Sequence, residues 1–83
     1  MGKHDKVIDA ILQGTSDANI AFEDIRGLLV NLGFDERIRG SHHLYRKHGI
    51  DEKINIQRAG YKAKPYQVRQ IREIILKYHL TSE

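Results

Sequence analysis

The fold of this chain is decided in the stretch Gly33-Phe34-Asp35-Glu36-Arg37-Ile38-Arg39-Gly40-Ser41-His42-His43-Leu44-Tyr45-Arg46, where the hydrophobic period changes from that of a helix to that of a strand. Residues 34–39 alternate between the two faces of a first predicted strand, because successive side chains of a strand point in opposite directions. Gly40-Ser41 is predicted to turn the chain, and residues 42–47 are predicted to return as a second strand. The stretch therefore predicts a β-hairpin that directly follows a helix.

A third strand is predicted over residues 53–57, where Ile54 and Ile56 alternate with polar residues. We expect residues 48–52 to form the loop that joins this strand to the second one. Residues 58–64 are expected to form a basic loop that contains a glycine. The three strands together predict an antiparallel meander with one buried face.

Three amphipathic helices are predicted around these strands. The first covers residues 4–13 and ends at Gly14, which is typical of a C-terminal cap. The second covers residues 22–32 and is closed by Gly33 in the same way. The third begins at Pro65, a residue that suits the first helical position, and runs to about residue 79.

The connector between the first two helices is polar, and either Asp17 or Asn19 is expected to cap the second helix. Gly27 lies in the middle of that helix, where glycine costs roughly 1 kcal/mol relative to alanine. We therefore expect another element to approach the second helix closely at Gly27.

The predicted order of helix, helix, three strands and helix indicates an α+β fold, with helices on one face of the sheet and the other face open. Its α-β-β-β-α core resembles the double-stranded-RNA-binding fold, with an extra N-terminal helix before it. We expect a single domain, in which residues 1–19 form the N-terminal helix and connector and residues 20–80 form the core. In so short a chain, an active site is expected on the surface or in a shallow groove.

The composition narrows the classes of protein that need to be considered. Cysteine is absent, which excludes disulfides, thiol nucleophiles and zinc–thiolate sites. No apolar run is long enough to span a bilayer, and the first residues lack the apolar region of a signal peptide, so we expect a soluble cytoplasmic protein.

Charge is distributed unevenly along the chain. Through Gly33 the chain has three Lys or Arg against five Asp or Glu, and after it eleven against six. The positive potential therefore belongs to the half that contains two adjacent histidines.

His42 and His43 follow the predicted turn and lie between Arg39 and Arg46. An imidazole can exchange a proton near neutral pH while neighbouring arginines hold a phosphate, a combination that suits RNA chemistry. Spacing alone favours the alternative that both are ordinary strand residues, and it leaves open which of the two faces the core. Because adjacent strand residues point to opposite faces, the pair is not expected to bind one metal ion, and we expect neither a metal nor a cofactor.

The chain resembles the HicA toxins of bacterial toxin–antitoxin systems over about residues 20–80. The resemblance rests on Gly33-Phe34, on Arg37-Ile38-Arg39-Gly40-Ser41-His42-His43-Leu44-Tyr45-Arg46, on Ile54-Asn55-Ile56 and on the closing amphipathic helix. Family members typically carry Gly-Ser-His-His followed by a hydrophobic residue, an aromatic residue and arginine. Many of them end the third strand with Val-Pro, where this chain has Ile56-Gln57.

The resemblance implies an mRNA interferase, which cleaves mRNA without the ribosome and is held inactive by a HicB antitoxin. It also implies that His42, directly after Gly-Ser, is the catalytic residue. Gly40, Ser41 and His43 are the expected supporting residues. Gly40 allows the chain to turn sharply, and Ser41 either donates to a phosphate oxygen or bonds its own backbone as a turn residue. The side chains expected to bind RNA are the cations Arg37, Arg39, Arg46, Lys47, Lys62, Lys64 and Arg69.

Two other functions are compatible with the same residues. A non-catalytic RNA-binding module would bind RNA in a salt-dependent way and leave it intact. A protein-interaction domain would use the exposed sheet and the basic helix for a protein partner, and the basic residues would otherwise form a solvated surface. Tyr45, Tyr61 and Tyr66 either stack on unpaired bases or pack against the core.

Overall fold

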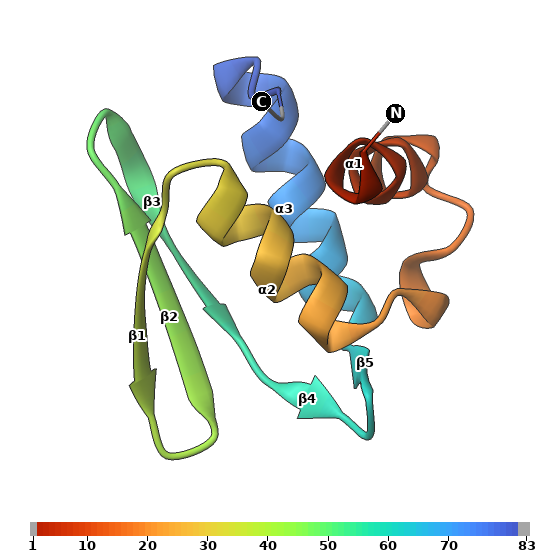
Figure 1. Cartoon of the computed structure of the whole chain (residues 1–83), viewed down its shortest axis with the longest axis horizontal. Coiled ribbons are helices and arrows are strands. Elements are labelled where there is room, and N and C mark those ends of the chain that lie inside the picture. Colours follow the sequence, from red (N-terminus) through yellow and green to blue (C-terminus); the bar gives the residue numbers. More distant parts are fainter. Residues whose placement is uncertain (1, 82–83) are drawn as a thin grey trace.

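The computed structural model describes residues 2–81, which form one α+β domain (Figure 1). In chain order the elements are α1 (Lys3–Gln13), the short 3₁₀ helix η1 (Asp17–Asn19), α2 (Phe22–Asn31), β1 (Asp35–Arg39), β2 (His42–Lys47), β3 (Ile50–Ile56), β4 (Arg58–Ala59), β5 (Lys62–Ala63) and α3 (Pro65–Tyr78). The predicted order and fold class are therefore confirmed. Within residues 2–81, no helix has the length and apolar character needed to cross a membrane.

The strands β1, β2 and β3 form one antiparallel sheet in that order, and β4 and β5 form a separate two-stranded hairpin. Helices α2 and α3 lie between the three-stranded sheet and α1, so α1 packs on the other two helices (Figure 1). No helix or strand among residues 2–81 covers the far face of the sheet. That face of the sheet is therefore open to solvent.

The core lies between the sheet and the helices, and aliphatic side chains dominate it. Tyr45 is the largest fully buried side chain, and its ring is completely shielded from solvent. The other fully buried residues come from the three α-helices and from β3 and include Ile11, Phe22, Ile25, Leu28, Ile54, Ile56 and Val68. Burial of this apolar surface is the main stabilising contribution to so small a domain.

The predicted helices and their ends are largely confirmed. Gly14 adopts the left-handed conformation and its N–H donates to the carbonyl of Ile11, as a C-terminal cap does. Gly27 lies against α1, because a methyl group at that position would come within 3.3 Å of the His4 ring. The glycine therefore permits the close approach of α1 to α2, as expected.

The predicted boundary of the third strand is wrong. Residues 48–52 were expected to form a loop, but β3 begins at Ile50 and only His48 and Gly49 form the turn. Gly49 has a φ of 90°, a conformation that other residues rarely adopt, and this allows a two-residue turn. Ile50 is then buried and pairs with Lys47, so the strand begins earlier than the predicted residues 53–57.

The segment 58–64 was expected to be a loop, and it contains the hairpin of β4 and β5 instead. The hairpin is held by backbone hydrogen bonds to the chain that enters α2. The Phe22 N–H donates to the carbonyl of Tyr61 at 2.8 Å, and the Ala63 N–H donates to the carbonyl of Ile20 at 2.9 Å. These contacts are distant in sequence, which is why the local pattern of residues did not reveal them.

The expectation that Asp17 or Asn19 caps α2 is also wrong. Ala21 precedes the helix and provides no side-chain cap. Asp17 instead accepts two hydrogen bonds from Arg72 of α3, at 2.9 and 3.0 Å, and Arg72 also donates to the carbonyl of Ile11. A bidentate arginine–carboxylate pair is stronger than a single capping bond, so Asp17 joins η1 and the end of α1 to α3.

Candidate functional site

His42 is the first residue of β2 and lies exposed on the open face of the sheet. The burial of Tyr45 decides this orientation, because side chains alternate along a strand and Tyr45 points toward the helices. Leu44 and Arg46 share the open face with His42. The sequence left this choice open, and the structure places the imidazole where solvent reaches it.

His43 points the other way, toward α2. Its ring packs edge-on against the ring of Phe22, with centroids 4.8 Å apart and an interplanar angle of 76°. The side chain is half-buried, and its Nδ1 atom is shielded from solvent. His43 therefore contributes to packing and lies on the opposite side of the sheet from His42.

The turn before His42 requires glycine at its first position. Gly40 has a φ of 58°, in the left-handed region, and the space around it is open. Backbone conformation, rather than crowding, is the reason for glycine here. The turn brings Ser41 beside His42, and the Ser41 hydroxyl accepts a hydrogen bond from the Gln57 amide at 3.5 Å.

The His42 ring has a polar neighbour at each nitrogen. Nδ1 lies 3.2 Å from Oδ1 of Asn55, and Nε2 lies 3.4 Å from Nε2 of Gln57. The amide oxygen of Gln57 in turn accepts a hydrogen bond from Lys64 at 3.2 Å. Sequence reasoning missed Gln57 and Asn55 as site residues, because only strand pairing brings the end of β3 beside the start of β2.

Four cationic side chains occupy the open face beside His42. Arg39 lies directly opposite His42 in the pairing of β1 with β2. A surface hollow of about 550 Å³ continues along the face from there, and its lining consists of Arg37, Arg39, Arg46, Lys53, Asp35 and Leu44. Lys53 was not predicted, although its alternation with Ile54 is the signal that would have placed it on this face. The arrangement is suited to a polyanion that runs along the strands.

The other predicted cations do not join this group as a whole. Lys47 lies on the helix side, where its ammonium donates to the carbonyl of Leu32 at 2.8 Å. Lys62 donates to Asn19 at 3.1 Å, and Arg69 is exposed on α3. Lys64 is connected to the His42 site through Gln57. The structure therefore brings together Arg37, Arg39 and Arg46 with His42 and adds Lys64 at one end.

The three tyrosines considered for base stacking separate into two groups. Tyr45 is part of the core, so stacking of RNA bases on its ring is excluded. Tyr61 and Tyr66 are exposed, at 69% and 56% of their surface. The ammonium of Lys62 lies over the ring of Tyr61, 5.4 Å from its centre.

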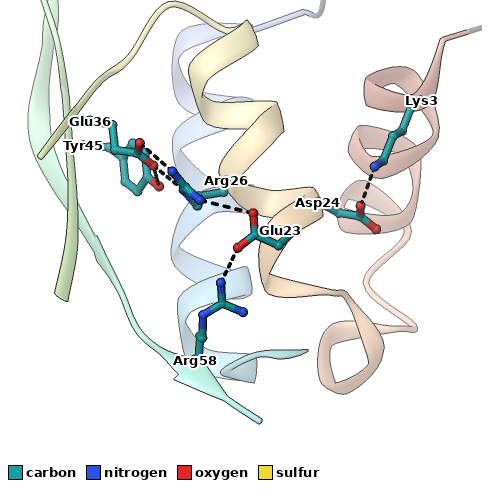
Figure 2. Close-up of polar contacts among 7 residues, drawn as sticks. All are labelled: Lys3, Glu23, Asp24, Arg26, Glu36, Tyr45 and Arg58. Atoms are coloured by element: carbon teal, nitrogen blue, oxygen red, sulfur yellow. Dashed lines mark hydrogen bonds and ion pairs between the residues drawn. The ribbon is translucent and has the colours of Figure 1, made fainter. Parts of the chain in front are cut away.

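On the helix side of the sheet, a charged cluster joins β1 and β2 to α2 (Figure 2). Arg26 donates two hydrogen bonds to Glu36, at 2.6 and 3.0 Å, and the Tyr45 hydroxyl donates to the same carboxylate at 2.5 Å. The bonds from Arg26 and Tyr45 hold the pKa of Glu36 at about 2, although burial opposes them. Burial and the ionised Glu36 raise the pKa of Tyr45 above its ordinary value. Glu36 is therefore ionised and Tyr45 protonated near neutral pH.

We expect this cluster to make the stability of the domain depend on acidic pH. Because the pKa of Glu36 is lowered from 4.5 to about 2 in the folded state, its contribution is complete above pH 4.5 and is lost as the pH falls toward 2. We expect a loss of about 2 kcal/mol over that range, after allowance for solvent screening of a partly exposed pair. Urea unfolding at a series of pH values measures it.

The matched variants for that titration are Glu36→Gln and Glu73→Gln, since Glu73 is exposed on α3. Glu36→Gln is expected to be less stable at neutral pH and to show a flatter dependence on acidic pH. Equal pH dependence in the two variants would contradict the assignment to Glu36.

No family model, curated protein or solved structure matches this chain. Among residues 2–81, no three histidine, aspartate or glutamate side chains gather in a way that could hold a metal ion. The site consists of one exposed imidazole, its amide neighbours and a row of cations.

Proposed function

We propose that this protein is a metal-independent endoribonuclease of the HicA toxin type, with His42 as its catalytic residue and mRNA as its substrate. The observation that carries the proposal is the exposed imidazole of His42 beside Arg39, at one end of a cationic sheet face. A proton-transfer group next to phosphate-binding groups is the minimal requirement for RNA cleavage without a metal.

The reaction uses the RNA's own 2′-hydroxyl as the nucleophile. The 2′-oxygen forms a bond to the adjacent phosphorus while His42 takes up the hydroxyl proton, and the bond from phosphorus to the 5′-oxygen breaks. The leaving oxygen takes a proton from water. The products are a 2′,3′-cyclic phosphate and a 5′-hydroxyl.

The cations of the open face supply the second requirement. The phosphorane-like transition state carries more negative charge on its oxygens than the substrate does, and guanidinium groups stabilise that charge by hydrogen bonds. Arg39 is the nearest of them to His42 along the strand pairing, and Arg46 and Arg37 extend the row. The remaining phosphates of the strand would lie along these residues.

The proposed protein partner is a HicB-family antitoxin, which would neutralise the activity. This part of the proposal rests on the resemblance of residues 33–46 to the HicA pattern. A small neighbouring reading frame that encodes an acidic HicB-like protein would support it, and co-expression that leaves RNA cleavage undiminished would contradict it.

The direct test is incubation of the purified chain with single-stranded RNA in the presence of EDTA. We expect fragments that end in a 2′,3′-cyclic phosphate, because the nucleophile belongs to the substrate. RNA that stays intact in the presence of the folded protein would contradict the proposed ribonuclease activity.

The row of cations also supports a second candidate, a non-catalytic RNA-binding module. That module would bind RNA through the same open face with a strong dependence on salt, and long incubation would produce no fragments. Cleavage in EDTA separates the two functions.

Both functions predict that Arg39→Gln and Arg46→Gln weaken RNA binding. Each variant is expected to reduce the slope of log affinity against log salt by about 1, since each removes about one phosphate contact. Fluorescence anisotropy at several salt concentrations measures the slope. Lys6→Met, on the exposed side of α1, removes the same charge far from the sheet and is expected to leave the slope unchanged. Equal slopes for Arg39→Gln, Arg46→Gln and Lys6→Met would show that RNA does not bind on the open face of the sheet.

A further inference from the structure

A chain of hydrogen bonds runs from Lys64, the residue before α3, to His42 at the start of β2. The Lys64 ammonium lies 3.2 Å from Oε1 of Gln57, and Nε2 of Gln57 lies 3.4 Å from Nε2 of His42. On the far side of the ring, Nδ1 of His42 lies 3.2 Å from Oδ1 of Asn55. These four side chains come from three separate elements or their ends.

The chemistry of the groups gives this chain a single direction. An ammonium only donates, so it must face the oxygen of the Gln57 amide, and the NH₂ group of Gln57 then faces His42. Since that NH₂ group only donates, Nε2 of His42 accepts and carries a lone pair. The ring hydrogen is therefore on Nδ1, where Asn55 Oδ1 accepts it.

Two further contacts hold Gln57 in place. Its backbone N–H donates to Oε1 of Gln67 at 3.1 Å, and Gln67 is only 2% exposed. The second hydrogen of its amide reaches the Ser41 hydroxyl at 3.5 Å. Every polar atom of the Gln57 side chain thus has a partner, and the orientation of the amide is determined by them.

Lys64 is the group that prevents the reverse orientation. If the Gln57 amide rotated by half a turn, its NH₂ group would meet the Lys64 ammonium, and two donors would face each other. The bond to Lys64 would be lost and the charge would repel the positive end of the amide dipole. Without the ammonium, the two orientations of the amide would differ much less in free energy.

We propose that Gln57 and Lys64 are positioning residues that hold His42 as the Nδ1–H tautomer, with Nε2 as the proton-accepting atom. The consequence for catalysis rests on the proposed ribonuclease function: His42 would begin the reaction as the base. The 2′-hydroxyl of RNA replaces the Gln57 N–H at Nε2, and Gln57 keeps its bonds to Ser41 and Lys64. The tautomer itself is a property of the free protein.

Long-range ¹H–¹⁵N NMR of the purified, RNA-free chain tests the tautomer directly. In mildly alkaline solution, where an imidazole is neutral, we expect Nδ1 of His42 to resonate as a protonated nitrogen and Nε2 as an unprotonated one. A protonated Nε2 in the unmodified protein would overturn the proposal.

Variants at both positioning residues extend the test. Lys64→Met is expected to shift the Nε2 resonance toward the protonated value, because the Gln57 amide can then turn its oxygen to the ring. Gln57→Glu should have the larger effect, since a carboxylate accepts from Nε2–H. Lys62→Met is the matched control, because Lys62 bonds Asn19 and not Gln57, and its His42 resonances should stay unchanged. Unchanged resonances in both Lys64→Met and Gln57→Glu would contradict the proposal.

RNA cleavage provides the second readout. Lys64→Met is expected to lower kcat by roughly tenfold with a smaller change in KM, since the loss is of proton transfer rather than of binding. A change in KM alone would assign Lys64 to RNA binding and contradict the positioning role. If the unmodified protein cleaves no RNA while the predicted tautomer is observed, the ribonuclease proposal fails and the positioning role stands.

Discussion

Replacement of His42 by alanine is expected to lower the rate of RNA cleavage by at least about 100-fold, in the range typical for loss of a general acid–base group. The ring is exposed and contributes only surface hydrogen bonds, to Asn55 and Gln57, so the fold should survive its removal. The measurement is the initial rate of cleavage of single-stranded RNA in EDTA. Circular dichroism of the same sample verifies that the variant is folded.

The matched control for that variant is His48→Ala. His48 is also exposed, but it lies in the turn between β2 and β3, at the end of β2 far from His42. We expect its cleavage rate to equal that of the unmodified protein. If His42→Ala kept full activity, the assignment of His42 as the catalytic residue would be wrong. If no sample cleaved RNA, the non-catalytic binding module would be favoured.

Replacement of Tyr45 by alanine is expected to reduce the free energy of unfolding by about 4 kcal/mol. The ring is fully buried between the sheet and the helices, and its removal leaves a cavity that the surrounding side chains cannot fill. The substitution also removes the hydroxyl that donates to Glu36. In a domain of this size the expected fall in the thermal midpoint is at least roughly 15 °C.

Two further variants separate packing from hydrogen bonding at this position. Tyr45→Phe keeps the ring and should cost about 1.5 to 3 kcal/mol, the typical effect of one hydrogen bond to a charged group. Tyr61→Ala removes an exposed tyrosine from the β4–β5 turn and should change stability by less than about 0.5 kcal/mol. Equal effects of Tyr45→Ala and Tyr61→Ala in urea unfolding would show that the ring of Tyr45 is not part of the core.

Most of the secondary structure could be predicted because the relevant signals are local. The positions of Gly14, Gly33 and Pro65 mark helix ends through backbone conformation, which depends little on distant residues. The alternation of apolar and polar residues is also a local signal, and it predicted the strands of the sheet. The early start of β3 was missed because a two-residue turn at His48-Gly49 joins strands whose pairing, not composition, defines their length.

The site was predicted less completely than the fold. His42 and three of the arginines were identified from the sequence, and the structure places them together on one face. Lys47 was assigned to the same group, but it lies across the sheet and bonds the end of α2. The face of the sheet that a strand residue occupies depends on which of its neighbours in the strand are buried. In β2 the buried neighbour is Tyr45, and the sequence left open whether Tyr45 packs against the core.

The sequence by itself determined the order of the elements, the hairpin after α2 and the presence of an imidazole among arginines, because each depends on neighbours along the chain. Only the tertiary structure decided that His42 faces solvent and His43 faces Phe22, since the burial of Tyr45 selects one side of the sheet. It alone also brought Gln57 and Lys64 to the ring. The physical reason is that contacts between β2, β3 and the start of α3 join residues far apart in the chain, and hydrophobic burial rather than local conformation selects them.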